Sequence, residues 1–372
     1  MKKLAAIMLC AVCAIFHVKA YAAEVPRTGA QAYVLYCPDN GGILASKDEN
    51  THMKPASTTK LMTALITLER AAKGNEIVTF TKDMTAEGSS MYLKLGEQVT
   101  LRDLAVGMMM SSGNDAANAA ALSVGGSTEG FAQLMNARAS EIGMENTHFV
   151  TPSGLDDEDH YSTAYDLALL MAEGLKNEEF ANLTSLKSAQ VVFREPHDKR
   201  VTYTNHNRLL SLYKYCVGGK TGYTQAAGRC LVSAAEKDGL TLICVTLNDK
   251  SDWDDHISLY EYGFSRLKAV HSADSEYRLN VPLVGGEDDT VPVIGAKDFS
   301  ATAEADAEIE RRVMLDNFIY APVESGRQVG RIEYRANGEL LGAVPLLAAA
   351  DAPEQQSPKG FFEWIKDLFK HG

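Results

Sequence analysis

The sequence predicts an α/β sandwich with an antiparallel sheet and a helical subdomain, followed by a small all-β domain and a terminal amphipathic helix. Three observations lead to this prediction. β-prone runs occur at 31–49 and again at 230–247, and a long helical block separates them. A sheet built from two distant segments with helices between them is typical of a sandwich rather than a doubly wound fold. Beyond residue 270 the pattern changes to alternating strands with short turns.

The first 22 residues carry a targeting pattern rather than a fold signal. Two lysines follow the first methionine, an apolar run covers residues 4–16, and Ala20-Tyr21-Ala22 fits a cleavage site. The apolar run is too short to cross a bilayer as a helix. We therefore predict a signal peptide over residues 1–22 and export of the remaining chain.

Residues 23–270 are predicted to form the larger domain. Turn residues at 38–42 follow a β-prone run and predict a hairpin over 31–49. Leu61, Leu65 and Leu68 recur on one face and predict a helix over 56–72. Further helices are predicted over 101–122, 127–142 and 163–176, and further strands at 191–193, 230–235 and 240–247.

The cysteines beyond the signal peptide are expected to be small buried apolar residues rather than a disulfide framework. If residues 236–239 form the turn between the last two strands, Cys244 faces Leu231 and Cys230 points to the other face of the sheet. A disulfide between Cys230 and Cys244 is therefore not expected. The other two cysteines of the mature chain are Cys37 and Cys216.

The C-terminal part is predicted to be β-rich over residues 271–348, with a short helix around 302–312. Residues 327–347 read as two strands joined by the turn Ala336-Asn337-Gly338. Residues 349–358 have linker composition. Residues 359–372 form an amphipathic pattern with aromatic residues on its apolar face, which favours a membrane surface over docking on the protein itself.

The overall charge limits the partners. The formal net charge of −13 indicates an acidic surface, whereas binding nucleic acid requires a basic one. We therefore expect no nucleic acid partner. The composition, 45% hydrophobic and 23% charged, is that of a globular protein with a large core.

Three short motifs carry chemistry: Ser57-Thr-Thr-Lys60, Ser112-Gly-Asn114 and Lys220-Thr-Gly222. A serine hydroxyl becomes a strong nucleophile only when a neighbouring base takes its proton. Residues three apart on a helix share a face, so Lys60 can be that base if its amine is neutral. Burial and a second cation such as Lys220 both lower a lysine pKa. The set needs no metal or cofactor.

Each motif alone has a structural explanation: a helix start, a turn inside buried structure, and an edge strand after a glycine turn. Their order and spacing together favour serine acyl transfer. The combination closely resembles the S-x-x-K, S-D-N and K-T-G pattern of penicillin-binding proteins and class A β-lactamases, with Gly113 in place of the aspartate of many β-lactamases.

The chain resembles the D-alanyl-D-alanine carboxypeptidases, low-molecular-mass penicillin-binding proteins of serine peptidase family S11. The resemblance extends to four longer segments: Pro55-Ala-Ser-Thr-Thr-Lys-Leu-Met-Thr63, Thr147-His-Phe-Val-Thr-Pro-Ser-Gly-Leu-Asp156, Asn205-His-Asn-Arg-Leu-Leu210, and Lys220-Thr-Gly-Tyr-Thr224 with Ala227-Gly228. It implies the penicilloyl-serine transferase fold, also called β-lactamase-like, and covers residues 28–267 and the C-terminal layout.

The resemblance also implies roles for the residues of the site. Ser57 would be the nucleophile, Lys60 its base, and Ser112 the proton relay to the leaving D-alanine. Asn114 would orient the peptide amide. Lys220 and Thr221 would bind the terminal carboxylate, on the strand that Gly222 continues. The N–H groups of Ser57 and Tyr223 would form the oxyanion hole.

The resemblance further implies the partners and the location. Stem peptides of peptidoglycan ending in D-Ala-D-Ala would be the substrate, and β-lactam antibiotics would acylate the same serine. The enzyme would work at the outer face of the cytoplasmic membrane, facing the cell wall. In some members an arginine downstream of the K-T-G strand helps to bind the substrate carboxylate. This chain has no arginine between Arg229 and Arg266, so Lys220 and Thr221 would act alone or with another arginine such as Arg208.

Three alternatives use parts of the same sequence. A β-lactamase would need an added glutamate between the second and third motifs, and none of the glutamates there lies in an E-x-x-x-N setting. A slow penicillin-binding sensor would use the same three motifs. A metallopeptidase would draw on the acidic clusters ending at His160 and His256, but neither has H-E-x-x-H spacing, so no metal is expected.

Overall fold

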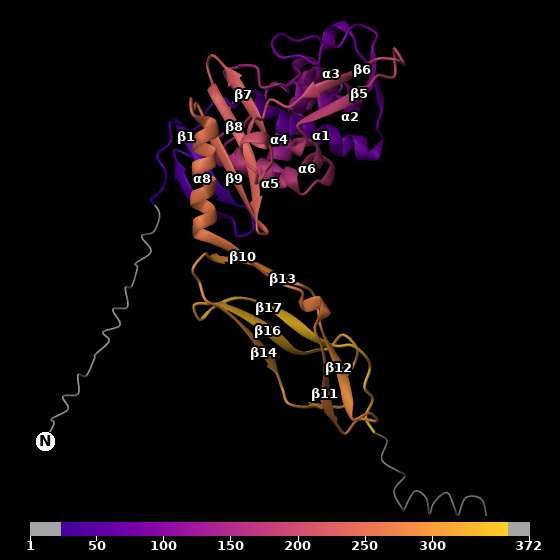
Figure 1. Ribbon diagram of the computed structural model, residues 1–372. Coiled ribbons are helices and arrows are strands. Elements are labelled where there is room, and N and C mark those ends of the chain that lie inside the picture. The colour runs from indigo at the N-terminus through magenta and orange to yellow at the C-terminus, as the bar shows by residue number, and fades with distance from the viewer. Residues whose placement is uncertain (1–23, 356–372) are drawn as a thin grey trace, which may run out of the picture.

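The computed structural model describes residues 24–355. The predicted signal peptide and the predicted terminal helix lie outside the described residues. Figure 1 shows a larger part that contains helices and a sheet, and an elongated part made of strands. Strand β10 (Leu267–Ser272) leads from the first part into the second.

The larger part is built on one antiparallel sheet in the order β2-β1-β9-β8-β7. Strands from the beginning and the end of this domain pair in one sheet, which confirms the prediction. Strand β1 is buried along its whole length because both of its faces are covered. Strand β7 lies at the edge of the sheet, which leaves one side of it open to other groups. The strands are β1 (Ala32–Cys37), β2 (Gly42–Lys47), β7 (Cys216–Thr224), β8 (Gly228–Lys237) and β9 (Leu240–Leu247).

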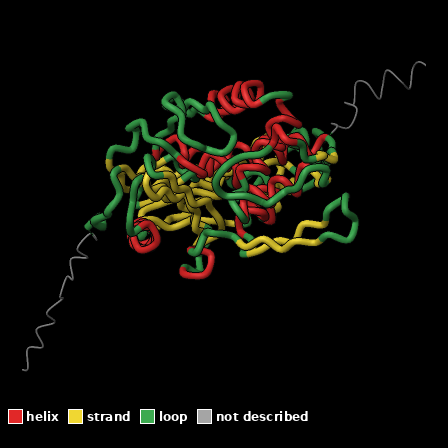
Figure 2. Tube along the Cα trace, turned by 90° about the horizontal axis from the view of Figure 1, so that it is seen from above, coloured by secondary structure: helices red, strands yellow, loops and turns green. Residues whose placement is uncertain are grey.

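Helices cover both faces of this sheet (Figures 1 and 2). The helical block packs on one face and forms the largest hydrophobic core with it. Helix α8 packs on the other face and forms a second core. The predicted face of α1 is confirmed, since Leu61, Leu65 and Leu68 are all buried. The helices are α1 (Lys60–Lys73), α2 (Leu101–Met110), α3 (Asn114–Gly125), α4 (Thr128–Ile142), α5 (Ala164–Leu175), α6 (Glu178–Ser185), α7 (Leu209–Leu212) and α8 (Asp252–Arg266).

The turn between β8 and β9 is tighter than predicted. Lys237 pairs with Leu240, so only Asp238 and Gly239 form the turn, and both have positive φ as a two-residue hairpin requires. Cys244 therefore lies opposite Ser233, and the prediction that it faces Leu231 is wrong. The shift is by two residues, which preserves the face of each side chain. Cys37, Cys216, Cys230 and Cys244 are all free.

Two features of this part differ from the sequence prediction. The strand predicted at 191–193 belongs to a separate hairpin of β5 (Ser188–Val192) and β6 (Arg200–Thr204) rather than to the main sheet. The acidic cluster beginning at Asp252 is the first turn of α8, where carboxylates are favoured by the helix dipole. A further two-stranded sheet pairs β3 (Ile77–Thr79) with β4 (Gln98–Thr100).

The C-terminal part holds a six-stranded sheet in the order β14-β16-β17-β12-β11-β15, with its own hydrophobic core. The predicted helix around 302–312 is wrong: the end of β13 and the start of β14 occupy these residues. The predicted turn at Asn337-Gly338 is confirmed between β16 and β17. The strands of this sheet are β11 (Arg278–Val284), β12 (Thr290–Gly295), β14 (Ile309–Leu315), β15 (Ile319–Tyr320), β16 (Gln328–Ala336) and β17 (Glu339–Ala348). Strand β13 (Phe299–Glu304) pairs with β10 in a separate two-stranded sheet.

The described part of the predicted linker runs along the C-terminal sheet. Ala352 is buried and exchanges two backbone hydrogen bonds with Val323, at 2.7 and 2.9 Å. Among residues 24–355 there is no helix whose length and apolar character would let it cross a membrane.

Candidate active site

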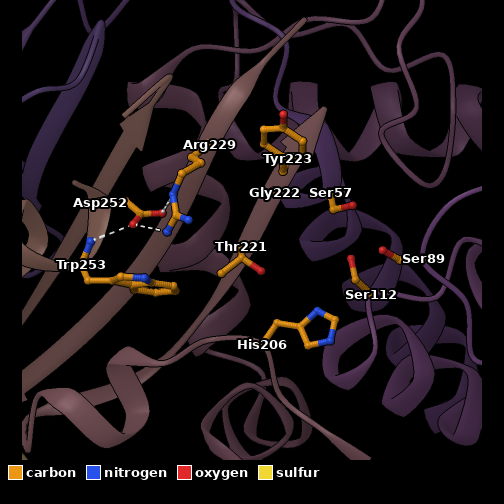
Figure 3. A pocket seen from close by; sticks show the side chains of 10 residues that line it. All are labelled: Ser57, Ser89, Ser112, His206, Thr221, Gly222, Tyr223, Arg229, Asp252 and Trp253. Carbon is orange, nitrogen blue, oxygen red and sulfur yellow. Dashed lines mark hydrogen bonds and ion pairs between the residues drawn. The ribbon is translucent and has the colours of Figure 1, made fainter. Parts of the chain in front are cut away.

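The three motifs meet at one end of the larger part, where the edge strand β7 passes the start of α1 and the turn between α2 and α3. They border a cavity of about 510 Å³. In Figure 3 the cavity has serine side chains on one side, the Arg229 group on the other, and Thr221 between them. Its lining residues are Ser57, Ser89, Ser112, His206, Thr221, Gly222, Tyr223, Arg229, Asp252 and Trp253.

Ser57 and Lys60 come together because a 3₁₀ turn (Ala56–Thr59) leads directly into α1. The Nζ atom of Lys60 lies 2.9 Å from Ser57 Oγ and 2.7 Å from the backbone oxygen of Ser153. Lys60 is fully buried, with 0% of its surface exposed. Within residues 24–355 no carboxylate forms an ion pair with this amine, so its contacts are those of a base beside a hydroxyl.

Burial is the main reason why the pKa of Lys60 lies well below its usual value, and the nearby charge of Lys220 lowers it further. Asp115 acts in the opposite direction with a smaller effect. A neutral lysine amine has one lone pair. Since Lys60 donates to the oxygen of Ser153, that lone pair is available to accept the proton of Ser57.

The second motif forms the turn between α2 and α3, and Ser112 adopts a positive φ of 56° there. This conformation is uncommon for a residue with a side chain and is often found at functional sites. Lys220 Nζ donates to Ser112 Oγ at 3.0 Å and to the backbone oxygen of Thr221 at 2.8 Å. Burial lowers the pKa of Lys220 to about 7.

Asn114 is buried at the start of α3, and only one of the two polar atoms of its side-chain amide is hydrogen-bonded. Its Nδ2 donates to the backbone oxygen of Glu87 at 2.6 Å, whereas its Oδ1 is buried and has no hydrogen-bond partner in the part of the chain that the structure describes. An unpaired buried acceptor costs free energy unless a ligand supplies the donor. The neighbouring Asp115 fixes the adjoining loop by accepting from the backbone N–H groups of Met91 and Leu93.

The third motif lies on β7, and Gly222 allows this strand to approach the Ser57 turn. A side-chain carbon at Gly222 would lie 3.0 Å from the oxygen of Pro55 and 3.1 Å from the nitrogen of Ser57. Such distances are tighter than ordinary van der Waals contacts, so glycine is the residue that fits. Tyr223 follows with 66% of its surface exposed at the rim of the cavity.

The structure brings an arginine to the cavity from a position that the sequence comparison had not considered. Thr221 pairs with Leu231, and Tyr223 pairs with Arg229 on β8. Residues two apart share a face of the sheet, so Arg229 is a diagonal neighbour of Thr221 and its long side chain can reach past it. Arg208 does not line this cavity.

Arg229 is held in place by the first turn of α8. Its Nε and one terminal nitrogen donate to the two oxygens of Asp252, at 3.2 and 2.5 Å. Asp252 is buried, and the guanidinium carbon lies 5.6 Å from the centre of the Trp253 ring. The guanidinium retains further N–H donors for an anion.

Five of the eight site residues predicted from the sequence line the cavity: Ser57, Ser112, Thr221, Gly222 and Tyr223. Lys60 and Lys220 contact the hydroxyls of Ser57 and Ser112, and Asn114 begins α3 two residues after Ser112. The sequence reasoning missed Ser89, Arg229, Asp252 and Trp253, and gave no role to His206. Burial and Lys220 lower the pKa of His206. Arg229 could have been found from the hairpin between β7 and β8, because the pairing of these strands places it beside Thr221. Finding it from the sequence requires the register of that pairing.

Several side chains that the alternative interpretations would use are engaged elsewhere. Glu173 pairs with Arg138 and Lys176, and Glu179 pairs with Arg102. None of the glutamates between the second and third motifs lines the cavity. His256 bonds to the hydroxyls of Ser233 and Thr246, and its neighbour Asp252 holds Arg229. Nothing in these contacts favours a β-lactamase or a metallopeptidase.

Comparison with known proteins identifies the class that this fold and site define. The family model described as D-alanyl-D-alanine carboxypeptidase, peptidase S11, matches residues 19–251. The model for the C-terminal domain of penicillin-binding protein 5 matches residues 266–354. The chain therefore belongs to the S11 family of D-alanyl-D-alanine carboxypeptidases.

Relatives and solved structures agree with this assignment over most of the chain. The D-alanyl-D-alanine carboxypeptidase DacF of Bacillus subtilis is 31% identical over 91% of this chain and 88% of its own. DacC of Escherichia coli is 31% identical over 93% and 88%. The crystal structure of penicillin-binding protein 5 from Haemophilus influenzae covers 89% of this chain and 100% of its own, with a TM-score of 0.68 and 28% identity.

Proposed function

We propose that this protein is a serine-type D-Ala-D-Ala carboxypeptidase that removes the terminal D-alanine from peptidoglycan stem peptides. The observation that carries the proposal is the 2.9 Å contact between Ser57 Oγ and the fully buried amine of Lys60, whose pKa lies well below its usual value. Burial favours the neutral amine, and a neutral amine can act as a general base.

Acylation begins when Ser57 Oγ attacks the carbonyl carbon of the penultimate D-alanine and its proton passes to Lys60. The N–H groups of Ser57 and Tyr223 stabilise the oxyanion, as donors do at the developing charge of acyl transfer. When the C–N bond breaks, Ser112 Oγ gives its proton to the leaving nitrogen of D-alanine and takes up the proton that Lys60 had accepted, so that Lys60 is neutral again. The 3.0 Å contact of Ser112 with Lys220 supports this relay.

Deacylation returns the enzyme to its starting state. Lys60 accepts a proton from a water molecule, whose oxygen attacks the acyl carbon. The ester bond breaks and Ser57 Oγ regains a proton. The shortened stem peptide leaves as a carboxylic acid. Penicillins react by the same first step, when the Ser57 hydroxyl opens the β-lactam ring and remains acylated.

Three groups bind the substrate in this account. The free Oδ1 of Asn114 accepts the amide N–H of the stem peptide. The Thr221 hydroxyl, backed by Lys220, binds the terminal carboxylate. Arg229 provides the fixed positive charge of that carboxylate site, because it lines the same cavity and Asp252 orients it. An arginine fork suits the two oxygens of a carboxylate.

For the location we propose the outer face of the cytoplasmic membrane. Residues 1–22 act as the signal peptide, 23–270 as the peptidase domain and 271–348 as a β-rich domain. Residues 349–358 act as a linker, and 359–372 bind the membrane surface as an amphipathic helix. The apolar and aromatic pattern of residues 359–372 supports the last step.

The test of both proposals uses two variants of the full chain. Ser57→Ala should abolish D-alanine release from a pentapeptide and covalent labelling by penicillin, a loss on the order of 10⁴-fold or more. Deleting residues 359–372 should leave both activities intact and release the protein from membranes. Labelling that persists in Ser57→Ala would refute the nucleophile, and membrane binding that persists after the deletion would refute the anchor.

A further inference from the structure

A buried histidine outside the cavity holds the segment that orients Lys60. His160 has 2% of its surface exposed, and no step of the proposed reaction uses it. Its Nε2 lies 2.9 Å from the hydroxyl of Thr59, inside the turn that carries the nucleophile. Its Nδ1 lies 3.0 Å from the backbone nitrogen of Val150 and 3.1 Å from that of Thr151.

These contacts determine the form of the imidazole ring. A backbone N–H can only donate, so Nδ1 accepts and carries no hydrogen. The neutral ring then has its hydrogen on Nε2 and donates it to Thr59 Oγ1. Burial lowers the pKa of His160 to about 4, which agrees with the neutral form. The ring thus connects two segments that are far apart in sequence.

The segment held by His160 ends at the oxygen that accepts from Lys60. Residues 150–156 lie against the Ser57 turn so closely that a side-chain carbon at Gly154 would be 1.8 Å from the oxygen of Ala56. Thr63 Oγ1 donates to the oxygen of Pro152 at 2.6 Å, and the next oxygen, that of Ser153, accepts from Lys60 Nζ. The same segment contacts β7 through Asp156, which accepts from Thr224 at 2.9 Å.

We propose that His160 is a positioning residue for Lys60: by donating to Thr59 and accepting from the backbone of 150–151, it fixes the Ser153 oxygen that directs the Lys60 lone pair toward Ser57. The inference rests on the proposed role of Lys60 as the base. His160 does not touch the substrate cavity, so its effect is on the chemical steps rather than on substrate binding.

The decisive comparison is between His160→Ala and His160→Gln. Glutamine has an amide oxygen that can accept from the backbone and an amide nitrogen that can donate to Thr59, whereas alanine provides neither. We expect His160→Ala to lower the rate constant for penicillin acylation and the kcat for D-alanine release about 10²-fold, as expected for a misplaced catalytic group. KM should change little, and His160→Gln should restore most of the rate.

A matched control separates positioning from general loss of stability. His256 is a second fully buried histidine of the same part, bonded to Ser233 and Thr246. His256→Ala should lower the melting temperature as His160→Ala does, while its rate per penicillin-titratable site stays near that of the parent protein. Thr59→Val provides a milder variant, since it removes only the acceptor of the Nε2 hydrogen.

The outcomes are distinct. Unchanged rates per titratable site in His160→Ala, or equal losses in His160→Ala and His160→Gln, would overturn the role of His160. If His160→Ala does not fold, unchanged rates in Thr59→Val would overturn it instead. Failure of the parent protein to be labelled at Ser57 would overturn the proposed function itself.

Discussion

Two lysines with different surroundings determine the chemistry at the scale of single residues. Lys60 and Lys220 are both buried, and burial makes the charged form of each amine less favourable. The pKa of Lys220 falls to about 7, and that of Lys60 lies well below its usual value because Lys220 adds to the effect of burial. Lys60 is therefore suited to accept protons, while Lys220 retains partial charge for an anion.

Arg229 leads to a prediction about the substrate carboxylate. Replacing Arg229 with glutamine should lower kcat/KM for a peptide ending in D-Ala-D-Ala by about 30- to 150-fold, because a charge-assisted hydrogen bond contributes roughly 2–3 kcal/mol. The same peptide with a C-terminal amide should show little change, since it has no negative charge to lose. Steady-state kinetics on both peptides would measure this difference.

Arg208→Gln is the matched control, because Arg208 is exposed and lies outside the cavity. An equal loss on the acid and the amide peptide in Arg229→Gln would show that Arg229 acts on the structure rather than on the carboxylate. A larger loss in Arg208→Gln would instead assign the carboxylate to Arg208.

At the scale of elements, the site depends on how closely β7 approaches the start of α1. Strand β7 is at the edge of its sheet, and Gly222 allows its backbone to lie beside Pro55 and Ser57. The α2–α3 turn completes the site from the helical side. The catalytic groups therefore come from three elements that contact one another directly.

Gly222→Val tests this approach. The branched side chain should push β7 away from the Ser57 turn and lower the acylation rate about 10²-fold, as displacements near 1 Å do. The free energy of unfolding should fall only moderately, because the strand lies at an edge. Gly326→Val, at an exposed turn of the C-terminal sheet, would show the cost of a glycine replacement far from the site. Acylation at the parental rate in Gly222→Val would contradict the account.

The elements also show what the sequence could predict. The period of Leu61, Leu65 and Leu68 predicted α1, and the Asn337-Gly338 turn predicted the β16–β17 hairpin. The three motifs were recognisable because their chemistry lies in adjacent residues. Arg229 was not, because its relation to Thr221 depends on the register between β7 and β8, which the turn of residues 225–227 sets. Helix α8 was missed because its acidic first turn resembles a loop.

At the scale of the whole molecule, two buried neutral histidines couple stability to pH. Burial lowers the pKa of His160 to about 4 and that of His256 to about 3, against 6.5 for an exposed ring. The unfolded chain therefore binds more protons between these values, and stability falls as the pH drops below about 6.5. His160 alone accounts for about 3 kcal/mol over this window. Asp249, whose pKa burial raises to about 6, acts in the opposite direction.

Thermal unfolding at several pH values would measure this coupling. We expect the melting temperature to fall from pH 6.5 to pH 4, and to fall less steeply in His256→Gln, which cannot titrate. If the melting temperature of His256→Gln depends on pH as strongly as that of the parent protein, His256 does not contribute to this coupling.

The two parts of the molecule have different roles. The larger part holds the site, and the elongated β-rich part extends away from it (Figure 1). If residues 359–372 bind the membrane, the β-rich part separates the site from that surface. The central claim remains that Ser57 is the acylated residue.

The measurement that tests this claim most directly is a mass spectrum of the penicillin adduct after proteolysis. The account predicts one added penicilloyl group, located on the peptide that contains Ser57 and absent from the Ser57→Ala protein. An adduct on another serine, such as Ser89 or Ser112 of the same cavity, would contradict it.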